Sequence, residues 1–64
     1  MSAAPGMLLI DPDPVERDRL RGELEACGWR VSVAEDAAAA VRLCEERPTE
    51  FRAAVVDLQL PGLQ

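Results

Sequence analysis

The apolar positions of the chain fall into three short runs separated by two amphipathic stretches. The first run, residues 7–10, is continuously apolar, and the third, residues 53–58, is apolar except at Asp57. Runs of this length predict strands that are buried on both faces, as in a parallel sheet. Residues 30–34 alternate polar and apolar side chains, which predicts a further strand that is half exposed at a sheet edge.

The two stretches between these runs have the pattern of helices. The first helix is predicted to begin at Pro14 with Asp13 as its N-cap. The second is predicted over residues 37–47, with Asp36 as its N-cap and Pro48 after its end. Each helix carries an apolar stripe that we expect to face the sheet, comprising Val15, Leu20, Leu24 and Cys27 in the first helix and Ala37, Ala40, Val41 and Cys44 in the second.

Strands and helices therefore alternate, and this order predicts a βαβαβ unit, an α/β fold with a parallel sheet and right-handed crossovers. A chain of 64 residues is too short for more than one domain. We expect residues 1–6 to form a flexible leader and residues 7–64 to form part of a domain, because an open α/β sheet normally continues beyond a third strand. A domain of this size buries only about 60% of its unfolded surface, so we expect marginal stability.

Charge and cysteine usage restrict the classes of function. Twelve acidic and seven basic residues give a net charge of −5, which argues against nucleic-acid binding by this segment because phosphate contacts require clustered Lys and Arg. The sequence has no histidine, and its two cysteines fall in different predicted helices, so a zinc site is excluded. We expect Cys27 and Cys44 to be small buried residues in a reducing cytosol.

The same composition bears on localisation. Residues 1–6 lack the basic and apolar regions of a signal peptide. No apolar run approaches the roughly 20 residues that a membrane span requires. We therefore expect a cytoplasmic protein that has no contact with a membrane.

Two of the predicted buried strands end in a carboxylate, the first at Asp11 and the third at Asp57. Ligands of open parallel sheets bind beyond the carboxyl ends of the strands, so neighbouring strands would bring these side chains into one acidic pocket. Magnesium suits such a pocket because it binds through one or two carboxylates, water and phosphate oxygens, and a carboxylate beside it can accept a phosphoryl group. The alternative is that Asp11 caps the next helix and Asp57 merely ends a strand.

The segments around these carboxylates resemble a known signalling family. Residues 7–14 form an apolar strand and an acidic turn with proline, residues 27–29 read Cys-Gly-Trp, and residues 31–37 read Val-Ser-Val-Ala-Glu-Asp-Ala. Residues 54–62, Ala-Val-Val-Asp-Leu-Gln-Leu-Pro-Gly, look like a phosphorylation-site strand and the loop after it. Together they resemble the N-terminal half of bacterial response-regulator receiver domains. The resemblance implies a flavodoxin-like α/β fold of three layers, truncated to strand order 2-1-3, in a signalling module rather than an enzyme.

The resemblance also implies roles for individual residues. Asp57 would be the phosphoacceptor, receiving its phosphoryl group from a sensor histidine kinase or a phosphotransfer protein of a two-component phosphorelay. Asp11 would bind Mg²⁺, partly through water, together with Asp57. Gln59 would contribute its backbone carbonyl to the same ion, a role that does not depend on its side chain.

Two features depart from the receiver pattern. Receivers carry a second acidic residue directly after the first, as a direct metal ligand, and Pro12 stands at that position here. Asp13 could replace it as a metal ligand only in a rearranged loop. The later strands of a receiver, with a hydroxyl residue and a lysine that sense the phosphate, have no counterpart in this sequence. These departures favour the alternative of a non-phosphorylated pseudo-receiver or truncated interaction module, in which the unpaired edge of the third strand invites self-association.

A third interpretation comes from a different class of protein. Residues 8–13, Leu-Leu-Ile-Asp-Pro-Asp, are similar to the strand and DxD motif that open haloacid-dehalogenase-like phosphatases. In such an enzyme Asp11 would be the nucleophile and Asp13 the general acid/base. That family continues with Gly-Thr or similar, where residues 14–15 are Pro-Val here, and it does not account for the match around Asp57.

Overall fold

The computed structural model describes residues 4–57 of the 64-residue chain. The three strands form one parallel sheet in the order β2-β1-β3. The elements, in chain order, are β1 (Gly6–Ile10), α1 (Pro14–Ala26), β2 (Arg30–Ala34), α2 (Ala37–Glu46) and β3 (Phe51–Val56). This confirms the predicted βαβαβ unit and the strand order 2-1-3, an arrangement consistent with a truncated flavodoxin-like fold.

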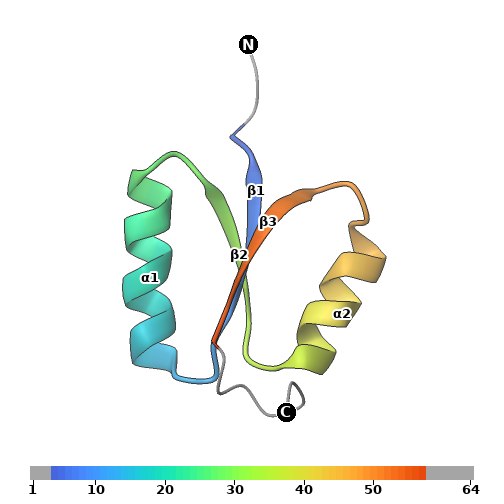
Figure 1. Ribbon diagram of the computed structural model, residues 1–64, viewed down its shortest axis with the longest axis horizontal. Coiled ribbons are helices and arrows are strands. Elements are labelled where there is room, and N and C mark those ends of the chain that lie inside the picture. The colour runs from blue at the N-terminus through green and yellow to red at the C-terminus, as the bar shows by residue number, and fades with distance from the viewer. Residues whose placement is uncertain (1–3, 58–64) are drawn as a thin grey trace.

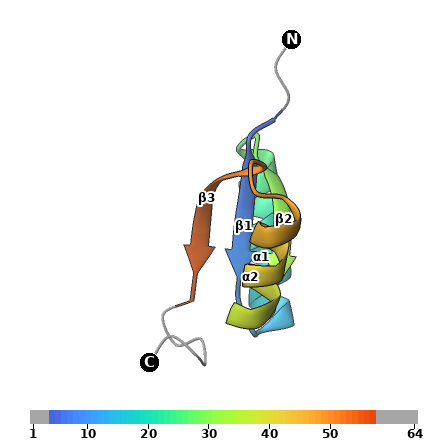
Figure 2. The same cartoon turned by 90° about the vertical axis from the view of Figure 1, so that its right-hand side faces the viewer.

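The two helices lie on opposite faces of the sheet, so the described residues form three layers (Figure 1). A quarter turn shows that both helices lie over β1 and β2, whereas β3 stands to one side of them (Figure 2). Neither helix of residues 4–57 is long and apolar enough to cross a membrane.

The core is built on the central strand, β1, all five residues of which are buried. Leu9 has no exposed surface at all, and among residues 4–57 it is the largest side chain that is completely enclosed. Leu8 and Ile10, on the other face, pack with Ala34 of β2 and Ala40 of α2 into a single apolar cluster. The prediction of a strand buried on both faces is therefore confirmed for residues 7–10.

The β3 strand differs from its prediction. It begins at Phe51, two residues earlier than the apolar run indicated, and Arg52, Ala53 and Ala54 are exposed. The expectation that this run is buried on both faces is wrong for Ala53 and Ala54, because β3 lies at the sheet edge and both helices lie mainly over β1 and β2. Residue 58, the last of the predicted run, lies outside the described residues.

The apolar stripe predicted for α1 is only partly correct. Leu20 and Leu24 are half-buried against the sheet, but the side chain of Val15 is 78% exposed and Cys27 is exposed. The two exposed residues lie at the helix ends, Val15 in the first turn and Cys27 at the C-cap. Burial of the predicted stripe is therefore limited to the middle of the helix, at Leu20 and Leu24.

The buried face of α2 is rotated relative to its prediction. Ala40 is buried and Ala37, Ala39 and Leu43 pack against the same cluster, whereas Val41 is 57% exposed and Cys44 is exposed. Placing Leu43 toward the sheet removes more apolar surface from water than placing Cys44 there, which favours this rotation. The expectation that both thiols are buried is wrong.

Residues 4–6, the described part of the expected leader, are held against the sheet. Gly6 is the first residue of β1, and its Cα lies so close to the Glu50 carbonyl that a side chain could not fit there. The Arg30 N–H donates to the Pro5 carbonyl at 2.8 Å, and the Arg30 guanidinium donates to the Ala4 carbonyl at 2.8 Å. Residues 4–6 are therefore tied to β2 and to the approach to β3.

Candidate functional site

The carboxyl ends of β1 and β3 carry the two carboxylates that the sequence singles out. Ile10 and Val56 are register partners at the ends of these strands, and Asp11 and Asp57 are the residues that follow them. The Asp57 N–H donates to the Ile10 carbonyl at 3.0 Å, which extends the pairing of the strands by one residue. The prediction that neighbouring strands bring Asp11 and Asp57 to one edge of the sheet is confirmed by this geometry.

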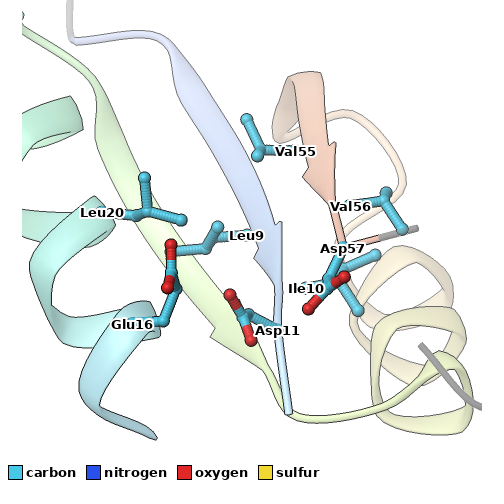
Figure 3. A pocket seen from close by; sticks show the side chains of 8 residues that line it. All are labelled: Leu9, Ile10, Asp11, Glu16, Leu20, Val55, Val56 and Asp57. Atoms are coloured by element: carbon cyan, nitrogen blue, oxygen red, sulfur yellow. The ribbon is translucent and has the colours of Figure 1, made fainter. Parts of the chain in front are cut away.

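Both carboxylates line one pocket, of about 400 Å³, between α1 and the ends of β1 and β3. Figure 3 shows Asp11 just after β1, between Glu16 of α1 and Asp57, which follows β3. The walls are apolar and are formed by Leu9, Ile10, Leu20, Val55 and Val56. Three acidic side chains, those of Asp11, Glu16 and Asp57, therefore lie against apolar walls in one pocket.

Asp11 is held firmly. It is only 3% exposed, and its Oδ1 accepts a hydrogen bond from the Asp13 N–H at 2.9 Å. Its own N–H donates to the Ala34 carbonyl of β2 at 3.1 Å, and its carbonyl accepts from Nη1 of Arg17 at 2.9 Å. These bonds fix both the backbone and the carboxylate of Asp11, whereas Asp57, on the less covered strand, is half-buried.

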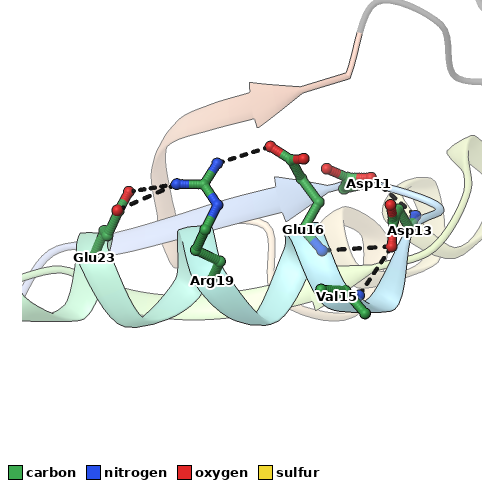
Figure 4. Close-up of polar contacts among 6 residues, drawn as sticks. All are labelled: Asp11, Asp13, Val15, Glu16, Arg19 and Glu23. Carbon is green, nitrogen blue, oxygen red and sulfur yellow. Dashed lines mark hydrogen bonds and ion pairs between the residues drawn. The ribbon is translucent and has the colours of Figure 1, made fainter.

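Asp13, rather than Asp11, caps the first helix. Its Oδ1 accepts from the Val15 N–H at 2.9 Å and from the Glu16 N–H at 3.4 Å (Figure 4). The alternative in which Asp11 is the cap is therefore wrong, and the predicted N-cap is confirmed. Of the described residues that line the pocket, Asp13 is not one, because its carboxylate is turned toward the α1 backbone.

Glu16 is the pocket carboxylate that the sequence reasoning missed. It pairs with Nη2 of Arg19 at 2.9 Å, and Arg19 also contacts Glu23 one turn further along α1 (Figure 4). The hydrogen bond with Glu16, together with the negative charge of Glu23, raises the pKa of the Arg19 guanidinium. Helical spacing could have revealed Glu16, since it lies four residues before Leu20 and therefore on the same face of α1.

The carboxylates fit the ligand chemistry of magnesium, which binds through one or two carboxylates with water and phosphate oxygens in the remaining positions. Asp11 and Asp57 are the residues that would hold it. Within residues 4–57 the structure contains no cluster of three or more Asp, Glu or Cys side chains that could hold a metal ion by themselves. Gln59, the third predicted ligand, lies outside the described residues.

Comparison with known proteins finds a similar segment in a longer protein. The chain is 39% identical over 57 residues to the sensor histidine kinase AruS of Pseudomonas aeruginosa, a match that covers 89% of this chain and 6% of that protein. The chain therefore spans about 6% of the length of this relative. No protein-family model matches the chain, and no solved structure matches it. The comparison thus shows a likeness to a segment of a sensor histidine kinase, whereas the likeness to a receiver domain that the sequence suggested stays a prediction.

Proposed function

We propose that this chain is a receiver-type module of a two-component phosphorelay that accepts a phosphoryl group on Asp57 from a sensor histidine kinase or phosphotransfer protein. One observation carries the proposal: Asp57 and the buried Asp11 line a single pocket at the carboxyl edge of β1 and β3. The similarity to a segment of a sensor histidine kinase supports the same signalling context.

The chemistry requires a carboxylate that is accessible and held in place. An Asp57 oxygen attacks the phosphorus of a phosphohistidine, the P–N bond breaks, and the imidazole leaves with the bonding electrons and takes up a proton. The product is an acyl phosphate on Asp57. Half-burial of Asp57 leaves a path for the donor, while its N–H bond to Ile10 fixes its backbone.

The other pocket residues set the electrostatics of this reaction. Asp11 and Glu16 add negative charge beside the incoming phosphoryl group, and this charge opposes the reaction unless it is compensated. Magnesium bound by Asp11 and Asp57 would supply that compensation. Asp11 suits the role because its backbone and carboxylate are already fixed before a cation arrives.

A second candidate is a non-phosphorylated pseudo-receiver that acts through its surface. It is favoured by the loop after β1, where Pro12 has no carboxylate and the Asp13 carboxylate caps α1. In that case Asp11 and Asp57 would serve as polar ends of their strands, and replacing Asp57 would leave partner binding unchanged.

The two candidates are separated by the intact mass of the chain after incubation with Mg²⁺ and acetyl phosphate. We expect the mass to rise by one phosphoryl group, and we expect Asp57→Asn to abolish the gain. Asp18→Asn is the matched control, because Asp18 lies on the exposed side of α1 and pairs only with Arg21 among the described contacts. A folded chain that gains no mass, under conditions that label an intact receiver, would establish the pseudo-receiver.

The remote alternative, a haloacid-dehalogenase-like phosphatase, can be tested with the same variants. The measurement is release of inorganic phosphate from a small phosphate ester. Activity that is lost on replacing Asp11 or Asp13 but retained in Asp57→Asn would favour the phosphatase interpretation. We expect no such turnover, since the Asp13 carboxylate accepts hydrogen bonds from the α1 backbone and does not line the pocket.

A further inference from the structure

The loop between β1 and α1 has few groups that can hold its shape. It consists of Asp11, Pro12 and Asp13, and proline has no N–H, so two backbone donors remain. The Asp11 N–H donates to the Ala34 carbonyl of β2, and the Asp13 N–H donates to Oδ1 of Asp11. Neither bond holds the carbonyl of Asp11, which belongs to the peptide that enters Pro12.

Arg17 supplies a donor to that carbonyl. Its side chain reaches back from the first turns of α1, and Nη1 lies 2.9 Å from the Asp11 oxygen. Arg17 is half-buried, and its backbone N–H donates to the Asp13 carbonyl at 2.9 Å. One residue therefore contacts both ends of the loop, through its side chain at Asp11 and through its backbone at Asp13.

The arginines further along the same helix behave differently. Arg19 and Arg21 form ion pairs with acidic residues of α1 and are about half exposed. Within the described residues, the Arg17 side chain instead donates a hydrogen bond to a backbone carbonyl. A bond from a charged donor is about twice as strong as one between neutral groups, so this contact has more influence on the loop than a neutral donor would.

Resting on the phosphoacceptor function proposed above, we propose that Arg17 is the positioning residue for the Asp11 carboxylate. The bond to the Asp11 carbonyl sets the plane of the peptide between Asp11 and Pro12. That plane sets the direction in which the chain reaches Asp13, whose N–H holds Oδ1 of Asp11 in the pocket. Loss of Arg17 frees this peptide, and the Asp11 carboxylate then has more than one orientation and binds a cation less well.

The test compares three variants of the same chain. Arg17→Gln removes the charged donor, Arg17→Lys keeps a charged donor with a different geometry, and Arg21→Gln is the matched control on the solvent side of α1. The first measurement is the exchange rate with water of the Asp13 amide hydrogen, by NMR. We expect about tenfold faster exchange in Arg17→Gln, partial recovery in Arg17→Lys and no change in Arg21→Gln, since one bond from a charged donor is lost.

The amide of Leu9, in the centre of the sheet, distinguishes positioning from general stability. We expect its exchange rate to be the same in the Arg17 variants as in the unaltered chain. Unchanged exchange at Asp13 in Arg17→Gln would overturn the proposal, and so would an equal acceleration at Asp13 and Leu9, because the residue would then act on the whole fold.

The second measurement is the Mg²⁺ concentration that gives half-maximal labelling of Asp57 by acetyl phosphate. We expect it to rise about tenfold in Arg17→Gln while the labelling rate at saturating Mg²⁺ changes by less than about twofold. A fall in the saturating rate with unchanged Mg²⁺ dependence contradicts the proposal. If the unaltered chain is not labelled at all, the phosphoacceptor function fails, and the Asp13 exchange rates still decide whether Arg17 positions Asp11.

Discussion

The strands β1 and β3 are neighbours with similar apolar sequences, yet they are buried to different extents. Leu8 pairs in register with Ala54, and Leu9 with Val55. Leu8 and Leu9 are 3% and 0% exposed, whereas Ala54 is exposed and Val55 is half-buried. The burial differs because both helices lie over β1 and β2, whereas neither lies over β3 (Figure 2).

This difference divides the candidate site into two unequal halves. Asp11 follows the covered strand and is buried and held on several sides. Asp57 follows β3, the strand that the helices leave largely uncovered, and is half-buried. Because regions with few buried apolar contacts open locally at low free energy, we expect β3 to open before β1 does. In the function proposed above, the firmly held Asp11 would bind the cation, and the less covered Asp57 would accept the phosphoryl group.

The largest effect should come from the centre of the covered strand. Leu9→Ala removes a completely enclosed side chain, and we expect the free energy of unfolding to fall by about 2–5 kcal/mol because a cavity is left in the core. Urea denaturation followed by circular dichroism measures the loss. Val55→Ala, the register partner on β3, is the control. Equal losses in the two variants would show that cover by the helices does not govern the contribution of each strand.

An intermediate effect is expected where β1 approaches the start of β3. A Cβ atom on Gly6 would collide with the Glu50 carbonyl, which is backbone and cannot rotate away. We expect Gly6→Ala to lower the free energy of unfolding by about 1–3 kcal/mol.

Gly22→Ala is the matched control for that substitution, because Gly22 lies in α1 with open space around it. We expect this change to raise the free energy of unfolding by about 1 kcal/mol, the difference in helix propensity between the two residues. Thermal unfolding of both variants measures the contrast, and changes of the same sign would contradict it.

The smallest effect on the free energy of unfolding is expected on β3. Ala54→Ser adds a hydroxyl group to an exposed position on β3, and we expect a change within about 0.5 kcal/mol in the free energy of unfolding. The same substitution at Ala34, which is 5% exposed in β2, should cost about 1–3 kcal/mol because the hydroxyl group is buried. A loss at Ala54 as large as that at Ala34, in urea denaturation, would show that another surface covers β3 in solution.

Most of the fold could be predicted from local patterns. The N-caps Asp13 and Asp36 were correct because capping is a local hydrogen bond between a side chain and the next turn of backbone. The helix stripes were less successful, since Val15, Val41 and Cys44 are exposed. Periodicity identifies an apolar face but does not determine how far the helix is rotated when it packs against a sheet.

The site was predicted in part. Asp11 and Asp57 could be found because each ends a predicted strand and parallel strands end at one edge of a sheet. Glu16 and Arg17 could not be found in this way. Helical spacing places Glu16 on the same face of α1 as Leu20, but Arg17 looks like any other charged residue of this helix. The roles of both residues depend on which side of the helix faces the end of β1.

The sequence by itself determined the order of elements, the caps that start the helices and the pair of carboxylates at the strand ends, because these depend on interactions between near neighbours in the chain. The tertiary structure decided how far β3 and the helix stripes are buried, that the Glu16 face of α1 meets the acidic pocket and that Arg17 holds the Asp11 carbonyl. Burial and charge placement depend on what lies across the sheet, and residues distant in the chain supply that surface.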